Sequence, residues 1–216
     1  AVQMAEDDDI EVKYVVANDD VASAPKAVKE QRHGIAGGFF MWKVGGARAA
    51  KGGSLDDVIA SAQNVVNRTK SICVGLEPCV IPALGHSNFK IEDGTMEFGV
   101  GHHGEAGTKV EKLKSASEMA QEMAETILND FDFEEGKEVA VMLSGLGATP
   151  VMELYVLYDE VEKVLAKAGH KVWKTYIGNY VTSLDMNGAS LTIVDLDDEI
   201  KELLSEPAVP IGMKNY

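Results

Sequence analysis

The sequence predicts an α/β fold, in which the remainder of an N-terminal α/β domain is followed by a second α/β domain with a mixed sheet. β-branched runs alternate with segments whose apolar residues recur at helical spacing. In the second half the strand-like runs are not each separated by a helix, which favours a mixed sheet over an all-parallel one. We place the domain boundary near residue 70. Residues 1–70 are then the C-terminal part of the first domain, with its N-terminal part absent, and residues 71–216 form the second.

The N-terminal residues have the pattern of the end of a helix. The chain does not start with Met, and residues 1–5 read like the last turns of a helix already under way, so we expect a chain that lacks its first part. Residues 10–17 are β-branched and predict a strand that ends at a turn. Residues 25–51 are helical in pattern but rich in glycine, which indicates either two helices or one helix packed very closely on a neighbour.

Capping residues mark the helices that follow. Ser54 is a predicted N-cap for a helix over residues 55–69, and Ser115 with Glu118 forms a predicted capping box for another. Gly169 stands where a left-handed C-cap is expected. The same rules predict strands at 71–76, 96–101, 138–144, 171–177 and 190–196, and helices at 150–168 and 197–204.

Charge and composition exclude several classes of function. The chain has 216 residues, of which 20 are basic and 35 acidic, so its net charge is −15. A field of that sign repels phosphate backbones and anionic lipids, and we expect neither a nucleic-acid nor a membrane partner. No apolar run approaches the roughly 18–20 residues of a membrane span, and the N-terminus has no signal-peptide pattern. We therefore expect a cytoplasmic protein.

Residues 97–107 form the most unusual stretch of the sequence. Glycines surround His102 and His103 at the end of a predicted strand. Glycine lets a backbone approach a ligand closely, and a histidine presented there can act as base, nucleophile or metal ligand. Adjacent residues on a strand point to opposite faces, so only one histidine is expected to face a given site. A turn with a surface histidine fits the spacing equally well.

Two further loops are weaker candidates. Residues 145–150 connect a strand to a helix N-terminus, which suits an anion, but a close-packed turn explains the same glycines. Residues 182–188 form a polar loop in which Asn187 and Gly188 predict a tight turn. We expect no metal site, because Cys73 and Cys79 have neither zinc nor redox spacing.

The segment MEFGVGHHGEAG, residues 96–107, closely resembles the signature of the substrate-binding K subunit of dihydroxyacetone kinases. The resemblance continues in the family's order over essentially the whole chain. The segments that carry it are VVANDDVA (15–22), RHGIAGGFF (32–40), GGSLDDV (52–58), SICVGLEPCVIPA (71–83), LGATPVMELY (146–155) and IGNYVTSLDMNGASLTIV (177–194).

The resemblance implies a covalent histidine. In this family the histidine of the G-x-H-G-E motif binds the ketone of dihydroxyacetone as a hemiaminal, and the matching residue here is His103. Gly101, His102, Gly104 and Glu105 would surround the substrate. His102 replaces a residue that is apolar in the family, and residue 106 is alanine where the family has proline.

The resemblance also implies partners. It is closest to the phosphotransferase-system-dependent form, a phosphoenolpyruvate–glycerone phosphotransferase of glycerol metabolism. There, a separate L subunit carries the nucleotide and Mg²⁺, and no cofactor is expected in this chain. The family's N-terminal part, with a glycine-rich loop, another active-site histidine and a catalytic aspartate, has no counterpart in this sequence. That segment, the L subunit and a second copy in a homodimer are the expected partners.

Two other functions fit the same residues. A non-catalytic paralogue would bind dihydroxyacetone through the same histidine and serve as a transcriptional co-activator or ligand sensor. A kinase for a related ketose, such as erythrulose, would differ in pocket-wall residues that the sequence does not identify.

Overall fold

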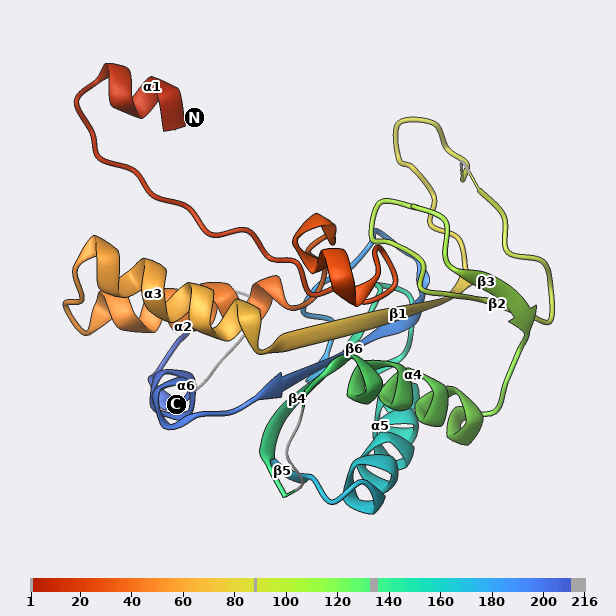
Figure 1. Ribbon diagram of the computed structural model, residues 1–216. Helices are drawn as coiled ribbons and strands as arrows, with labels where there is room; N and C mark the ends of the chain where they lie inside the picture. The colour runs from red at the N-terminus through yellow and green to blue at the C-terminus, as the bar shows by residue number, and fades with distance from the viewer. Residues whose placement is uncertain (1, 88, 133–135, 211–216) are drawn as a thin grey trace.

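The computed structural model describes residues 2–87, 89–132 and 136–210, which fold around one six-stranded sheet (Figure 1). The strands lie in the order β3-β2-β1-β6-β4-β5. They are β1 (Thr69–Glu77), β2 (Thr95–Phe98), β3 (Lys109–Lys112), β4 (Glu138–Gly145), β5 (Lys171–Gly178) and β6 (Asn187–Asp195). The helices are α1 (Val2–Asp7), the 3₁₀ helix η1 (Lys26–Gln31), α2 (Gly38–Ala50), α3 (Leu55–Asn67), α4 (Ala116–Asp130), α5 (Val151–Lys167) and α6 (Asp198–Ser205).

The sheet is mixed, as the sequence predicts. Strands β4 and β5 pair in parallel, because α5 carries the chain from the end of one to the start of the other. The pairs β1–β2, β2–β3, β1–β6 and β4–β6 are antiparallel. The described residues contain no helix that is long and apolar enough to span a membrane.

Helices cover both faces of the sheet, and β4 shows how its sequence allows this. Val141 and Leu143 pack into the core cluster beneath α4 and α5, whereas Ala140 and Met142 pack into the cluster beneath α2 and α6. Successive side chains of a strand point to opposite faces, so an unbroken apolar run is what two covered faces require.

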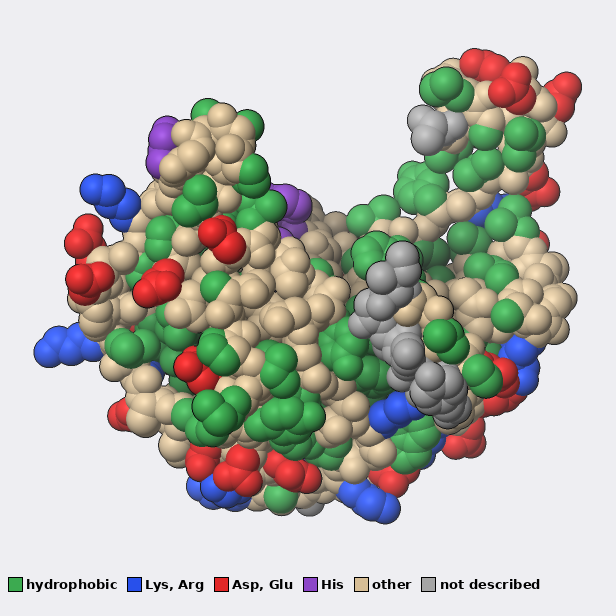
Figure 2. Space-filling model, turned by 180° about the vertical axis from the view of Figure 1, so that it is seen from behind, with side chains coloured by type: hydrophobic (Ala, Val, Ile, Leu, Met, Phe, Trp, Pro, Cys, Tyr) green, Lys and Arg blue, Asp and Glu red, His purple; other side chains and the backbone are tan. Residues whose placement is uncertain are grey.

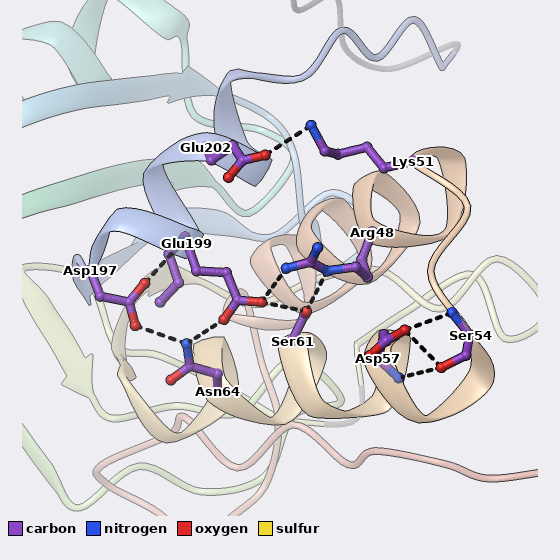
Figure 3. Close-up of polar contacts among 10 residues, drawn as sticks. Arg48, Lys51, Ser54, Asp57, Ser61, Asn64, Asp197, Glu199 and Glu202 are labelled. Carbon is purple, nitrogen blue, oxygen red and sulfur yellow. Dashed lines mark hydrogen bonds and ion pairs between the residues drawn. The ribbon is translucent and has the colours of Figure 1, made fainter.

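Polar contacts tie α2, α3 and α6 together (Figure 3). The Glu199 carboxylate on α6 accepts hydrogen bonds from Arg48 Nη2 at 2.6 Å and from Ser61 Oγ at 2.7 Å. The predicted N-cap at Ser54 is confirmed, since Ser54 and Asp57 form a complete capping box. Helices from the first 70 residues thus share a core with the sheet of residues 69–195, and the domain boundary at residue 70 stays a prediction.

One prediction in the first segment is wrong, and the structure decides between the two alternatives of another. Residues 10–17 form no strand, because no described strand pairs with them; Ile10, Tyr14 and Val16 are exposed instead. Figure 2 shows hydrophobic side chains along this projecting segment. The helical stretch at 25–51 consists of two helices, η1 and α2, separated by extended backbone. The short edge strand β3 was not predicted.

Two adjacent aspartates fasten the N-terminal segment to the sheet. The buried Asp19 carboxylate accepts hydrogen bonds from the backbone N–H groups of Ile35, at 3.2 Å, and Gly37, at 2.8 Å. The Ser71 N–H on β1 donates to the Asp19 carbonyl at 2.8 Å. Burial raises the pKa of Asp19, and burial also raises the pKa of Asp20 to about 6.

Asp20 therefore makes stability depend on pH. Its pKa rises from 3.8 to about 6 on folding, so the native state holds a proton that the unfolded state loses between these values. Wild-type stability should fall as pH rises through that window. Asp20→Asn keeps an oxygen for the Ala22 N–H and should be the more stable form above pH 7, by about 2–3 kcal/mol. Urea unfolding at several pH values measures this difference. Asp93→Asn, at an exposed position, is the control; equal pH profiles for wild type and Asp20→Asn would contradict the prediction.

Candidate functional site

The two histidines lie in a tight loop that begins where β2 ends. The loop is closed at its neck, because the Thr108 N–H donates to the Phe98 carbonyl at 2.8 Å and the Gly107 N–H donates to Glu97 Oε1 at 2.6 Å. Gly99 has a φ of +78°, and a Cβ there would lie 2.7 Å from the Ala22 Cβ. Glycine is therefore required at the point where the chain leaves the strand.

His103 is held from one side by Glu105. The His103 ring Nδ1 lies 3.1 Å from Glu105 Oε1, and the His103 backbone N–H donates to Glu105 Oε2 at 2.8 Å. Partial burial disfavours the carboxylate of Glu105, but hydrogen bonds from backbone N–H groups and the His103 ring outweigh it and lower the pKa of Glu105. An ionised carboxylate only accepts hydrogen bonds. In neutral His103 the proton is therefore on Nδ1, and the lone pair is on Nε2.

His103 is also accessible. Its side chain is 86% exposed, so the Nε2 lone pair is open to a ligand. Gly101 allows this arrangement, because a Cβ at Gly101 would lie 2.3 Å from Glu105 Oε2. Gly104, with a φ of +82°, makes the turn between His103 and Glu105.

His102 points inward and has both ring nitrogens engaged. Its Nε2 lies 3.3 Å from the Val181 carbonyl, and its Nδ1 lies 3.9 Å from Cys73 Sγ. Burial lowers the pKa of His102 and raises the pKa of Cys73. A neutral imidazole that donates through Nε2 and accepts the thiol proton at Nδ1 satisfies both contacts. His102 thus ties the loop to the rest of the protein, and its nitrogens are not free for a ligand.

The histidines line a pocket of about 510 Å³. The expectation that only one of them faces the site is wrong, because β2 ends at Phe98 and both residues lie in a turn rather than in a strand. Figure 2 shows histidine at the edge of the hollow between the projecting loop and the N-terminal segment. The walls come from three other parts of the chain: residues 34–35, residues 79 and 81, and residues 181–184.

The structure brings most of the predicted site residues together. Gly101, His102, His103 and Glu105 line an adjoining cleft of about 350 Å³, which includes Gly34 and Ile35. Gly104 shapes the turn without lining either space. From the sequence, Thr182 and Ser183 are recognisable only as members of a polar loop. The pattern does not show that the chain folds them against the histidine loop, where the His102 carbonyl accepts a hydrogen bond from Ser183 Oγ.

The glycine loop at 145–150 supports this wall. The Leu146 N–H donates to the Gly188 carbonyl at 3.1 Å, and the Ala148 N–H donates to the Met186 carbonyl at 3.0 Å. The Leu146 carbonyl accepts the Ser183 N–H at 2.8 Å. The N–H groups of Leu146 and Ala148 are therefore not available to a ligand, which favours the alternative of a close-packed turn. The tight turn of the next loop lies at residues 184–185, and Asn187 and Gly188 begin β6.

Metal-ligating side chains do not gather at this site or elsewhere in the part of the chain that the structure describes. Among residues 2–87, 89–132 and 136–210, no three His, Cys, Asp or Glu side chains are placed to hold one ion. The chemistry available at the site is that of a single exposed imidazole oriented by a carboxylate.

The chain is thus an α/β domain that carries a candidate nucleophilic histidine. The chain matches the Dak1 domain over residues 1–211, and it belongs to the Dak1 domain family. The resemblance seen in the sequence is thereby confirmed.

Similar proteins include kinase subunits and a co-activator. The dihydroxyacetone-binding subunit DhaK of PTS-dependent dihydroxyacetone kinase 1 from Listeria innocua is 39% identical over 199 residues, which are 92% of this chain and 60% of that protein. The D-erythrulose kinase of Mycolicibacterium smegmatis is 36% identical over 96% of this chain and 36% of its own. The solved dihydroxyacetone kinase operon co-activator Dha-DhaQ has a TM-score of 0.87 and 30% identity, over 95% of this chain and 64% of its own.

Gly147→Ala tests the support beneath the pocket wall. Gly147 has a φ of +132°, and a Cβ there would lie 1.9 Å from the Leu184 carbonyl oxygen. We expect a loss of about 2–4 kcal/mol in the free energy of unfolding, because backbone strain and overpacking add. Gly52→Ala is the matched control, since its φ of +82° is also positive but no atom lies near; it should cost about 1 kcal/mol. Denaturant unfolding compares the two variants, and equal losses would refute a steric role for Gly147.

Proposed function

We propose that this chain binds dihydroxyacetone covalently, as a hemiaminal on His103, and serves as the ketone-binding part of a dihydroxyacetone kinase. The observation that carries the proposal is the pairing of His103 Nδ1 with Glu105 at 3.1 Å, which leaves Nε2 of an exposed imidazole as a nucleophile. Membership of the Dak1 family and the likeness to DhaK subunits support the choice of ligand.

The bond-forming step uses groups that the loop brings together. The Nε2 lone pair of His103 forms a bond to the carbonyl carbon, and the π electrons of the C=O bond move to oxygen. The oxygen takes up one proton, and Nδ1 gives up one proton toward Glu105, so the adduct is a neutral N-substituted imidazole that carries a hydroxyl group. Glu105 orients the ring and accepts the proton that leaves.

Covalent capture explains how such an open site selects its ligand. Glycerol and other polyols have no carbonyl carbon and cannot form the bond, whereas hydrogen bonds alone discriminate poorly between small polyols. The tether also fixes the terminal hydroxyl of the ketone for attack on a phosphoryl donor, which lowers the entropic cost of that later step.

The phosphoryl donor in this proposal is a nucleotide-loaded L subunit, which carries the nucleotide and Mg²⁺. We place the reaction, which gives dihydroxyacetone phosphate, in the cytoplasm and in glycerol metabolism, with the chain acting as a homodimer. The chain spans about three-fifths of the length of the Listeria DhaK subunit, at 60%, so the complete kinase activity also needs residues that correspond to the rest of that subunit. The exposed apolar side chains of Ile10, Tyr14, Val16 and Trp42 offer a surface for such a segment.

A second function rests on a specific likeness. The co-activator Dha-DhaQ superposes with a TM-score of 0.87, so a chain of this shape can also serve as a ligand sensor without catalysis. Phosphoryl transfer to dihydroxyacetone, assayed with the complete gene product and an L subunit, separates the alternatives. A kinase turns over, whereas a sensor binds the ketone without turnover. Erythrulose in the same assay separates the two ketoses.

His103→Ala should abolish the covalent adduct, because His102, the other imidazole that lines the pocket, has both ring nitrogens engaged. NMR of dihydroxyacetone labelled with ¹³C at the carbonyl carbon detects the loss, since that carbon becomes tetrahedral in the adduct and its resonance moves. His102→Ala is the matched control and should retain the adduct, with weaker binding from the loosened loop. An adduct that survives His103→Ala but disappears in His102→Ala would place the nucleophile at His102.

Glu105→Gln should weaken adduct formation by about tenfold, the effect of losing one charge-assisted hydrogen bond of about 1.4 kcal/mol. A neutral amide no longer stabilises the proton on Nδ1 or accepts it during addition. Titration of the labelled ketone by NMR gives the affinity. Glu92→Gln, an exposed position outside the loop, is the control. Unchanged affinity in Glu105→Gln would show that the carboxylate has no part in the chemistry.

A further inference from the structure

A second, polar cleft lies away from the histidine pocket. It has a volume of about 410 Å³ and lies where η1, the ends of α3 and α4 and the start of β1 meet. Lys26 and Lys29 line it from η1, and Arg68 and Lys70 line it from the segment that leads from α3 into β1. None of its lining residues lines the histidine pocket. Three carboxylates, those of Asp130, Asp132 and Asp195, line it too, so the four cations leave a small positive excess in a chain of net charge −15.

The carboxylates of this cleft are already paired. The pairs are Asp130 with Arg32 at 2.7 Å, Asp132 with Lys26 at 2.7 Å and Asp195 with Arg68 at 2.6 Å. The Asp130 pair is bidentate, since Arg32 Nη2 also donates to the second carboxylate oxygen at 2.8 Å. The side-chain ammonium groups of Lys29 and Lys70 have no ion pair or hydrogen bond with any residue that the structure describes.

Lys70 is the unusual one of the two. It is 7% exposed, although Lys is almost never buried without a partner. Lys70, Ile72 and Val74 lie two residues apart along β1, so their side chains point to the same face of the sheet. Ile72 and Val74 pack in the core beneath α4, which places the Lys70 side chain on the α4 face. Burial lowers the pKa of Lys70, and the nearby Asp130 only partly opposes this. Its ammonium group lines the cleft, where an acceptor would offset the cost of its partial burial.

The end of α4 only partly satisfies the Lys70 ammonium group. The last carbonyls of a helix carry partial negative charge and favour a cation, but the Asp130 carboxylate at this end already binds Arg32 through both oxygens. Asn67 adds a donor rather than an acceptor, because its Oδ1 accepts from Gln63 at 2.9 Å and its amide N–H groups have no acceptor among the described residues. Apart from Asp195 Oδ1, a buried carboxylate oxygen with no hydrogen-bond partner among the described residues, the open hydrogen-bonding groups of the cleft are donors.

We propose that this cleft binds a tetrahedral oxyanion, either inorganic phosphate or the phosphate group of a small phosphate monoester, between Lys70, Lys29 and the amide of Asn67. The anion supplies the missing acceptor for the buried ammonium group, and the polar walls accommodate the rest of a small ester. This site is independent of the proposed ketone chemistry at His103, from which its lining residues are separate.

Binding of inorganic phosphate and of glycerol 3-phosphate to the purified chain, followed by ³¹P NMR at low ionic strength, tests the proposal. We expect saturable binding at millimolar concentration or below. Lys70→Met, which keeps the length of the side chain and removes the charge, should weaken binding by at least about tenfold. Lys112→Met, at an exposed position on β3, is the matched control and should leave binding unchanged. Tighter binding of the ester identifies a phosphate monoester as the ligand, and equal or tighter binding of inorganic phosphate identifies the free ion.

Lys29→Met keeps the test decisive if Lys70→Met does not fold. Lys29 is exposed, so its replacement leaves the core intact, and it should still weaken binding by several-fold. Two results would overturn the proposal: no saturable binding of either anion to the wild-type chain, or binding that neither lysine substitution weakens. Either result would make Lys70 a structural partner of the α4 C-terminus only. The carbonyl-labelled ketone should still form its adduct in Lys70→Met, which separates a failure here from a failure at His103.

Discussion

The antiparallel pairing of β1 with β6 is the constraint on which the rest of the molecule depends. The register runs from Thr69 opposite Val194 to Gly75 opposite Gly188, and it joins the antiparallel β1–β3 half of the sheet to the β4–β5 half. The close approach at Gly188 leaves no room for a side chain, because a Cβ there would lie 2.1 Å from the Val74 carbonyl oxygen. The histidine loop is also attached to β1, since the Gly99 N–H donates to the Cys73 carbonyl at 2.7 Å. One strand pair thus positions the loop, the wall at residues 181–184 and, at its other end, Lys70.

The two adjacent histidines have different roles: His102 is structural, and His103 is the proposed reactive residue. His102 is buried against Val181 and Cys73 and anchors the loop. His103 is turned outward by the glycines on either side of the pair and is oriented by Glu105. The same loop therefore holds the exposed imidazole of His103, the proposed nucleophile, in a fixed position. Such a site suits a small carbonyl ligand, which gains most of its affinity from one covalent bond.

Local signals in the sequence predicted most of the fold. Ser54, Ser115 and Gly169 mark helix ends through hydrogen bonds and backbone conformations that depend on a few neighbouring residues, and all three are where the sequence places them. Residues 10–17 have strand-forming side chains but no pairing partner, and β propensity alone cannot supply one. The short strand β3 has an exposed, charged sequence, so it lacks the apolar alternation on which the prediction relied.

The histidine motif was visible in the sequence, but its surroundings were not. Periodicity assigned His102 and His103 to opposite faces of a strand, and this failed because two glycines with positive φ, Gly99 and Gly104, turn the chain out of the strand. The pocket wall at residues 181–184 lies about eighty positions further along the chain, and only the sheet topology brings it near His102. Lys70 likewise reads as an ordinary strand residue until its burial and its lack of a partner are seen in three dimensions.

A crystal structure of this chain with dihydroxyacetone tests the central claim most directly. The proposed chemistry predicts continuous electron density from Nε2 of His103 to the former carbonyl carbon of the ligand, with Glu105 still within hydrogen-bonding distance of Nδ1. Density that joins the ligand to His102, or a ketone that lies in the pocket with no bond to either imidazole, would contradict it.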